Sequence, residues 1–156
     1  MNYTFRMLPV IASDLAHSRQ LTALLAGALE TTSAELEADL QYQHARQPVQ
    51  AWLAYEGNQL IGCKLGYERQ PGHYYSWLGG VHPDFRGRGV AGELMRQQHA
   101  WCQEQGYRRI RTHTYNRWRA MLLLNLRHGF DIVGTVQGTR GLTIVLEKNV
   151  LPAGGQ

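Results

Sequence analysis

A short run of glycines and arginines, PDFRGRGVAGELM at residues 83–95, constrains the fold more than any other segment of this chain. It follows a strand-like segment and opens a helix-like one, and residues 87–92 have the GxGxxG spacing of a dinucleotide-binding turn. Glycine tolerates positive φ and lets the backbone approach a ligand closely. The first amides of a helix have no partner within the helix and favour an anion. The run therefore predicts a loop that binds a phosphorylated ligand.

Two well-known glycine loops do not fit this run. A dinucleotide fold needs its glycines directly after a strand and an acidic residue about 20 positions later. Here residues 82–85 intervene, and the next strand-like segment, RRIRTHTY, ends without an acid. A nucleotide-triphosphate loop needs a Lys-Ser/Thr pair after the glycines, and none follows. Because Arg86 and Arg88 add cationic donors, we expect a pyrophosphate cradle; a glycine-rich turn with solvent-facing arginines is the alternative.

Hydrophobic periodicity and turn residues divide the rest of the chain into strands and helices. Strands are expected over residues 3–9, 49–56, 59–69, 73–81, 108–115, 130–137 and 142–148. Helices are expected over residues 12–29, 32–43, 89–105 and 117–128. Ser13 or Asp14 is expected to cap the first helix and Ser33 the second. The predicted order is β-α-α-β-β-β-α-β-α-β-β.

The composition limits the class of protein. The 156 residues suit a single domain over residues 1–150 with a loose tail at 151–156. The net charge of +4 is not gathered into the basic stripe of a nucleic-acid binder. Cys63 and Cys102 are too few and too far apart for a disulfide scaffold, and reduced thiols are typical of a cytoplasm. Since neither a signal peptide nor a membrane span is visible, we expect a cytoplasmic protein without nucleic-acid or membrane partners.

These motifs together resemble the GCN5-related N-acetyltransferases (GNAT), which bind acetyl-CoA. Their signature, Arg/Gln-x-x-Gly-x-Gly/Ala at the start of a helix, is matched by Arg86-Gly87-Arg88-Gly89-Val90-Ala91. The upstream Val81-His82-Pro83, the downstream Gly129-Phe130 and the order of elements agree as well. The resemblance implies an α/β fold of the α+β type. Its mixed, mostly antiparallel sheet would have splayed central strands and flanking helices.

The resemblance also implies a cofactor site. Acetyl-CoA would be the co-substrate, and no metal would take part. The residues expected to bind it are Val81, His82, Pro83, Arg86, Gly87, Arg88, Gly89, Val90, Ala91, Gly92 and Asn116. Asn116 could instead cap the following helix. The pair Gly79-Gly80 predicts a bulge or a close backbone approach, with the pantetheine arm along this strand; packing against Trp101 is the alternative.

Acetyl transfer to an amine needs a base for the amine and an acid for the departing thiolate. Many relatives place a tyrosine four residues before the Gly of the GF pair. Here that position is Asn125, whose amide can hydrogen-bond the sulfur but cannot protonate it. Where some relatives have a basic Glu, this chain has His113, which suits general-base work near pH 7. A water relay through Tyr75 is the second candidate, and His113 as an ordinary polar strand residue is the alternative.

The expected function is acetyl transfer from acetyl-CoA to an amine of a small molecule or a protein. The alternatives are a non-catalytic acyl-CoA-binding module and an acyltransferase that uses a longer acyl-CoA. Arg111, on the strand face of His113, hints at an acceptor with a carboxylate. His73, His82 and His113 lack the Cys or carboxylate spacing of a metal site. A homodimer is left open.

Overall fold

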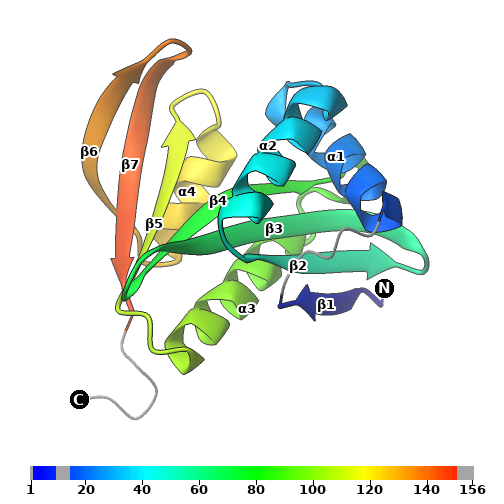
Figure 1. Ribbon diagram of the computed structural model, residues 1–156, viewed down its shortest axis with the longest axis horizontal. Helices are drawn as coiled ribbons and strands as arrows, with labels where there is room; N and C mark the ends of the chain where they lie inside the picture. The colour runs from blue at the N-terminus through cyan, green and yellow to red at the C-terminus, as the bar shows by residue number, and fades with distance from the viewer. Residues whose placement is uncertain (1, 10–14, 151–156) are drawn as a thin grey trace. The chain divides into compact units, whose positions relative to one another are not determined.

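The structure, a computed structural model, describes residues 2–9 and 15–150 (Figure 1). The predicted caps Ser13 and Asp14 and the predicted tail at 151–156 lie outside these ranges. The strands are β1 (Thr4–Leu8), β2 (Val49–Glu56), β3 (Gln59–Gln70), β4 (His73–Val81), β5 (Arg109–Tyr115), β6 (Asp131–Gly138) and β7 (Gly141–Asn149). The helices are α1 (Leu15–Leu29), α2 (Ser33–Arg46), α3 (Val90–Glu104) and α4 (Arg119–Arg127), with a short 3-10 turn, η1 (Pro83–Phe85). The predicted order of strands and α-helices is confirmed.

The strands form one sheet of seven in the order β1-β2-β3-β4-β5-β7-β6. β4 and β5 pair in parallel, whereas β1–β2, β2–β3, β5–β7 and β6–β7 pair antiparallel. The parallel ladder begins at His73 and Arg109 and ends at Ser76 and Thr112, before either strand does. The mixed, mostly antiparallel sheet is thus confirmed, and its central strands part after four residue pairs.

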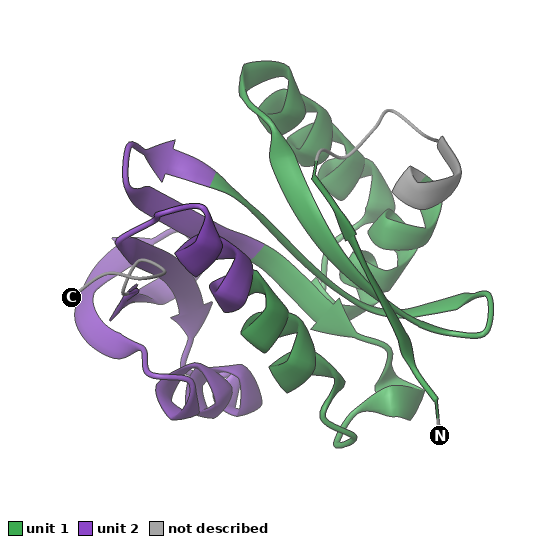
Figure 2. Cartoon of the chain, turned by 90° about the horizontal axis from the view of Figure 1, so that it is seen from below, with its two compact units in different colours: residues 1–67, 78–98 green, residues 68–77, 99–156 purple. Residues whose placement is uncertain are grey.

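The chain divides into two compact units, coloured in Figure 2, and each is described by itself. Unit 1 consists of residues 1–67 and 78–98, and unit 2 of residues 68–77 and 99–156. β3, β4 and α3 each contribute residues to both units. The single domain over residues 1–150 stays a prediction.

Helices pack closely against glycines in unit 1. A Cβ at Gly62 of β3 would lie 2.9 Å from Val90 Cγ1 of α3, and one at Gly80 of β4 would lie 2.6 Å from Ala28 Cβ of α1. Within this unit, α1 and α2 lie on one side of the strands and the first half of α3 on the other (Figure 1). Gly80 therefore packs closely against Ala28 of α1, and the pantetheine arm along this strand stays a prediction.

Two sequence expectations about packing and capping are wrong. Trp101, suggested as the partner of the glycine pair, packs edge-on against Tyr74 in unit 2, with ring centroids 5.5 Å apart. Thr32, not Ser33, caps α2, since its hydroxyl accepts a hydrogen bond of 3.1 Å from the Glu35 amide. Both hydroxyls are suitable caps, and only the backbone conformation decides between adjacent candidates.

Alternating burial along β5 orients the polar side chains of unit 2. Thr112 and Thr114 are buried, whereas Arg111, His113 and Tyr115 are partly or fully exposed. Successive side chains of a strand point to opposite faces. Arg111 therefore shares a strand face with His113, as expected, and Tyr115 lies on the same face.

Candidate functional site

The glycine-rich loop joins β4 to α3 within unit 1. Its backbone turns at Gly87 and Gly89, where φ is 76° and 81°. An added Cβ at either position would meet no atom within 4 Å. These positions need glycine because of their left-handed backbone conformation, and the space beside them is open to a ligand.

The two arginines of the loop are tied to neighbouring residues. Arg86 donates from Nε to the Val81 carbonyl over 3.2 Å, which links the loop to the end of β4. Arg88 donates to the Tyr3 hydroxyl over 3.3 Å, and its guanidinium carbon lies 5.4 Å from the centre of the Phe85 ring. Both side chains are exposed. A guanidinium has five N–H donors, so it can contact a neighbouring residue and a phosphate at the same time.

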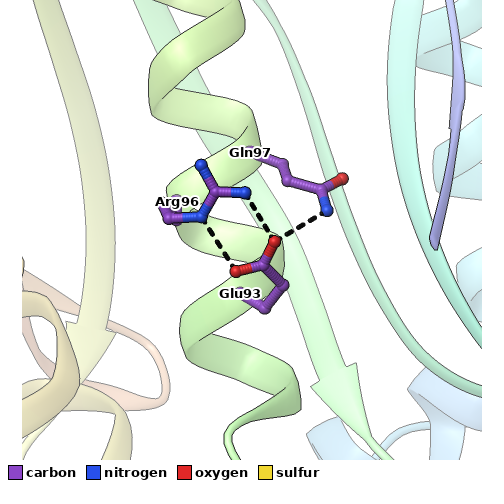
Figure 3. A network of polar contacts seen from close by, with 3 residues as sticks. All are labelled: Glu93, Arg96 and Gln97. Atoms are coloured by element: carbon purple, nitrogen blue, oxygen red, sulfur yellow. Dashed lines mark hydrogen bonds and ion pairs between the residues drawn. The ribbon is translucent and has the colours of Figure 1, made fainter. Parts of the chain in front are cut away.

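The first turn of α3 has backbone amides that can bind an anion. The Gly89 carbonyl accepts from the Glu93 amide over 3.0 Å, so the amides of Val90, Ala91 and Gly92 precede the first intrahelical bond and have no acceptor in the helix. The Glu93 carboxylate accepts from Arg96 and Gln97, which lie one turn further along (Figure 3). These bonds lower the pKa of Glu93 to about 2, so its charge is ion-paired at neutral pH. The loop and the helix start thus fit a pyrophosphate group.

The residues before the loop form a structured turn. The His82 amide donates to the Ile61 carbonyl over 2.7 Å, and His82 Nδ1 accepts from the Asp84 amide over 3.1 Å. Pro83 opens η1 and Phe85 is buried. The structure therefore brings Val81, His82 and Pro83 to the base of the loop, where His82 orders the turn.

His113 and Tyr75 are brought together in unit 2. Their ring centroids lie 5.1 Å apart in an edge-on arrangement. The pKa of His113 is lowered by partial burial of its ring and by the positive charges of Arg111 and Arg69. Since the ordinary pKa of histidine is about 6.5, its imidazole is neutral at pH 7 and can accept a proton.

Arg111 has a carboxylate partner that the sequence reasoning missed. Its Nε donates to Glu147 Oε2 over 2.8 Å, and Arg109 Nη1 lies 3.5 Å from the other oxygen of Glu147. Arg111 and Glu147 stand opposite each other on β5 and β7, 36 residues apart in the chain. Because strand pairing brings these two side chains together, no local pattern in the sequence indicates their contact. The Arg111 guanidinium is therefore already engaged by Glu147.

Asn125 and Asn116 occupy different environments in unit 2. Asn125 is buried, and its backbone carbonyl accepts hydrogen bonds of 3.1 Å each from the backbone amides of His128 and Phe130. These bonds terminate α4. Asn116 is exposed, and Trp118 is the N-cap residue of α4 without a side-chain capping bond. The suggestion that Asn116 caps this helix is therefore wrong.

Buried hydroxyl groups lie where the β4–β5 ladder ends. Thr112 donates to the Ser76 carbonyl over 2.9 Å, at the last pair of the ladder. The hydroxyl oxygens of Ser76 and Thr114 are buried and have no hydrogen-bond partner among the described residues. Such groups cost free energy unless a ligand or water completes them. Sequence reasoning passed over both hydroxyls, although polar residues at every second position of RTHTY were a signal.

The predicted site residues fall into both units. The loop residues from Val81 to Gly92 belong to unit 1, and Tyr75, His113, Asn116 and Asn125 belong to unit 2. In the described ranges, no three His, Cys, Asp or Glu side chains are grouped as metal ligands. No helix in the same ranges has the length and apolar character to cross a membrane.

Comparison with known proteins agrees with this fold. The model of the acetyltransferase (GNAT) family matches residues 19–130, which is more than half of the chain. A GNAT family acetyltransferase from Elizabethkingia anophelis, solved with acetyl-CoA bound, has a TM-score of 0.71 and 18% identity over 96% of this chain and 99% of its own. A search of curated proteins gave no match to the sequence.

Two further solved structures share the fold. The ribosomal-protein-S18-alanine N-acetyltransferase from Escherichia coli has a TM-score of 0.77 and 11% identity over 96% of this chain and 94% of its own. An aminoglycoside 6'-acetyltransferase type Ii has a TM-score of 0.79 and 15% identity over 94% of this chain and 98% of its own. The class is that of acetyl-CoA-dependent acyltransferases. Within it, the chain belongs to the acetyltransferase (GNAT) family.

Proposed function

We propose that this protein transfers an acetyl group from acetyl-CoA to an amine of a small molecule or a protein. The observation that carries the proposal is the loop before α3, with left-handed Gly87 and Gly89, open space beside them and unpaired first-turn amides. The solved relatives named above include one with acetyl-CoA bound, one that acts on a protein and one named for an aminoglycoside.

The loop would hold the pyrophosphate of the co-substrate. The amides of Val90, Ala91 and Gly92 would donate to its oxygens, with Arg86 and Arg88 as cationic donors beside them. Asn116 is kept as a further contact to the cofactor, because it is exposed and free of a capping role. Acetyl-CoA, when bound, supplies the thioester whose acetyl group is transferred.

The proton chemistry would rest on unit 2. His113 is the proposed base for the amine proton, because its neutral imidazole is only partly buried and lies beside Tyr75. Tyr75 with a water molecule is the second route for the same proton. Asn125 takes the place of the usual tyrosine acid, so departure of the thiolate would rely on hydrogen bonding rather than on protonation by this residue.

Two measurements test the proposal. Calorimetry should show that CoA binds more tightly than pantetheine, which lacks the phosphates, by at least tenfold, the equivalent of one charge-assisted hydrogen bond. A thiol-release assay with acetyl-CoA and a broad amine panel should then detect turnover. Tight CoA binding without turnover on any amine would favour the non-catalytic acyl-CoA-binding module. Faster turnover with propionyl-CoA or a longer acyl-CoA would favour the alternative that the enzyme transfers an acyl group longer than acetyl.

The homodimer and the cytoplasmic location stay predictions. Sedimentation velocity on the purified chain tests the first, and fractionation of the source cells tests the second.

A further inference from the structure

Lysine is scarce in this chain, and its two lysines have different surroundings. All the other residues among the 16 lysines and arginines are arginines. Lys64 of β3 is only 8% exposed, whereas Lys148 of β7 is partly exposed. Chemistry that needs a lysine amine within reach of solvent is therefore confined to Lys148.

The side chain of Lys148 is held against the end of α4 in unit 2. A Cβ at Gly129 would lie 3.5 Å from Lys148 Cε and 3.8 Å from its Nζ, so the lysine lies over the Gly129 backbone, where no side chain intervenes. Across the sheet, Lys148 stands opposite Ile110 of β5, which is fully buried. Opposite residues of paired strands share a face of the sheet, so the amine lies above a buried apolar layer.

An imidazole contacts the ammonium group of Lys148. Lys148 Nζ donates to Nδ1 of His99 over 3.0 Å, and His99, in the part of α3 that belongs to unit 2, is 7% exposed. Because an ammonium group has donors only, Nδ1 is the acceptor and the neutral ring carries its proton on Nε2. The His99 ring also packs edge-on against Phe130, with centroids 5.3 Å apart. The imidazole is thus held beside the lysine in the form that can take up a proton.

No carboxylate stabilises the charged form of Lys148. Among the residues that the structure describes, none forms an ion pair with it. Its chain neighbour Glu147 points to the opposite face of β7 and pairs with Arg111 there. Partial burial lowers the pKa of Lys148, so more of its amine is neutral near neutral pH than in an ordinary lysine. Only the neutral amine has the lone pair that a nucleophile needs.

We propose that Lys148 is a self-modification site that takes up an acyl group from a thioester, with His99 as the acceptor of the amine proton. The neutral Nζ attacks the carbonyl carbon of the thioester, an N–C bond forms, and the C–S bond breaks. The thiolate leaves, and the proton lost by the nitrogen passes to His99 Nδ1 and then to solvent. The products are an acylated lysine and a thiol, so the thioester is the only co-reactant.

This modification goes beyond the transfer to an acceptor amine proposed above. Its donor comes from solution, and neither the glycine loop nor His113 takes part in it. The acylated nitrogen keeps one N–H, which can still donate to His99, so the modified side chain is compatible with the fold.

Mass spectrometry can follow the two lysines separately. The purified protein is incubated at about pH 8 with S-acetyl-N-acetylcysteamine, a neutral thioester without phosphates, once folded and once in guanidinium chloride. Peptide mapping then gives the acetylation rate of each lysine. Lys148 should react at least tenfold faster in the folded protein than in the unfolded chain, because a positioned base contributes about 10²-fold or more. Lys64 should show the reverse order, because burial shields its amine.

A pair of histidine variants tests the role of the imidazole. His99→Asn keeps a hydrogen-bond acceptor, the amide oxygen, but this group cannot take up a proton at neutral pH. Acetylation of Lys148 should fall at least tenfold in the folded variant and should be unchanged in guanidinium chloride. His73→Asn changes a histidine at the start of β4 in the same unit and should leave both rates unchanged.

Three results would overturn the proposal. The first is a Lys148 that reacts no faster in the folded wild-type protein than in the unfolded chain, and this comparison decides even if His99→Asn fails to fold. The second is an unchanged rate in folded His99→Asn. The third is acetylation that occurs only with acetyl-CoA and accelerates with protein concentration, because the active site of another copy would then modify Lys148.

Discussion

In the proposed reaction, the charge state of the His113 imidazole decides whether this residue can take a proton from the acceptor amine at neutral pH. His113 lies in a strand face that also holds Arg111, and its ring contacts Tyr75. Partial burial and two arginines all lower its pKa, so protonation of this residue is unfavourable in the folded protein. A base of this kind works across the neutral range, because little of it is lost to protonation.

Replacing this imidazole should change the pH profile as well as the rate. In the wild-type protein, kcat/KM should rise with pH through an inflection below the ordinary histidine value of about 6.5, since only neutral His113 accepts the proton. His113→Ala should remove this inflection and lower kcat/KM by about 10²-fold, a usual loss for a missing general base. Stopped assays between pH 5 and 9 measure both.

Two other single substitutions serve as a control for His113→Ala and as a test of the proton route through Tyr75. His44→Ala changes an exposed histidine of α2 and should leave the profile intact. If Tyr75 and water carry the proton instead, His113→Ala will keep the inflection and nearly the full rate, and Tyr75→Phe will be the damaging change. Full activity in both variants would mean that positioning alone accounts for catalysis.

At the scale of an element, α3 has the same backbone conformation just outside each of its ends. Gly89 precedes the helix with a φ of 81°, and Gly106 follows it with a φ of 84°. An added Cβ would meet no atom within 4 Å at either position. The two glycines therefore carry the same conformational demand, but only Gly89 lies in the loop that is proposed to bind phosphate.

Because Gly89 and Gly106 have the same backbone conformation and similar open surroundings, substitutions at these two positions form a matched pair. Gly89→Ala and Gly106→Ala should each destabilise the protein by about 1 kcal/mol, the order of cost for a non-glycine residue at positive φ. Only Gly89→Ala should weaken CoA binding, by tenfold or more, because its methyl group enters the open space beside the helix start. Urea unfolding and calorimetry measure the two effects. Equal CoA affinity in the two variants would contradict the pyrophosphate cradle.

At the scale of the whole molecule, the sequence predicted those features whose signals are local. Strand 49–56 and its turn at Gly57 follow from a short, mostly apolar run and a turn residue, and β2 has those bounds. The glycine loop was visible because its residues are contiguous. The pair Arg111–Glu147 and the packing of Ala28 on Gly80 were not, since strand pairing and helix packing bring those residues together. Proximity between distant segments leaves no pattern in a single sequence.

Lys64 is another feature that only the folded chain reveals. It lies in β3, is 8% exposed, and forms no hydrogen bond or ion pair with any residue in the described ranges. Its Nζ lies 3.7 Å from the position that a Cβ of Gly79 would take. Burial lowers its pKa from 10.5 to about 8, partly opposed by the neighbouring Cys63. An ammonium group without a partner in this position costs the fold stability.

The loss of stability caused by the buried Lys64 ammonium should depend on pH. Because the pKa of Lys64 is lower in the folded state, protonated Lys64 opposes folding fully below about pH 8, and the penalty shrinks as the pH rises towards 10.5. The shift corresponds to about 3 kcal/mol at pH 7. Lys64→Met, which has an unbranched, uncharged side chain one atom shorter than that of lysine, should therefore be more stable than the wild type at pH 7.

The comparison between variant and wild type isolates this group from others. The buried thiol of Cys63, whose pKa is raised to about 12, destabilises the fold as pH rises, but it does so in both proteins. The advantage of Lys64→Met in urea unfolding should shrink by about 1 kcal/mol between pH 7 and 9, as folded Lys64 loses its proton. An advantage that is constant with pH, or a less stable variant at pH 7, would mean that the ammonium of Lys64 is neutralised or solvated in the folded protein.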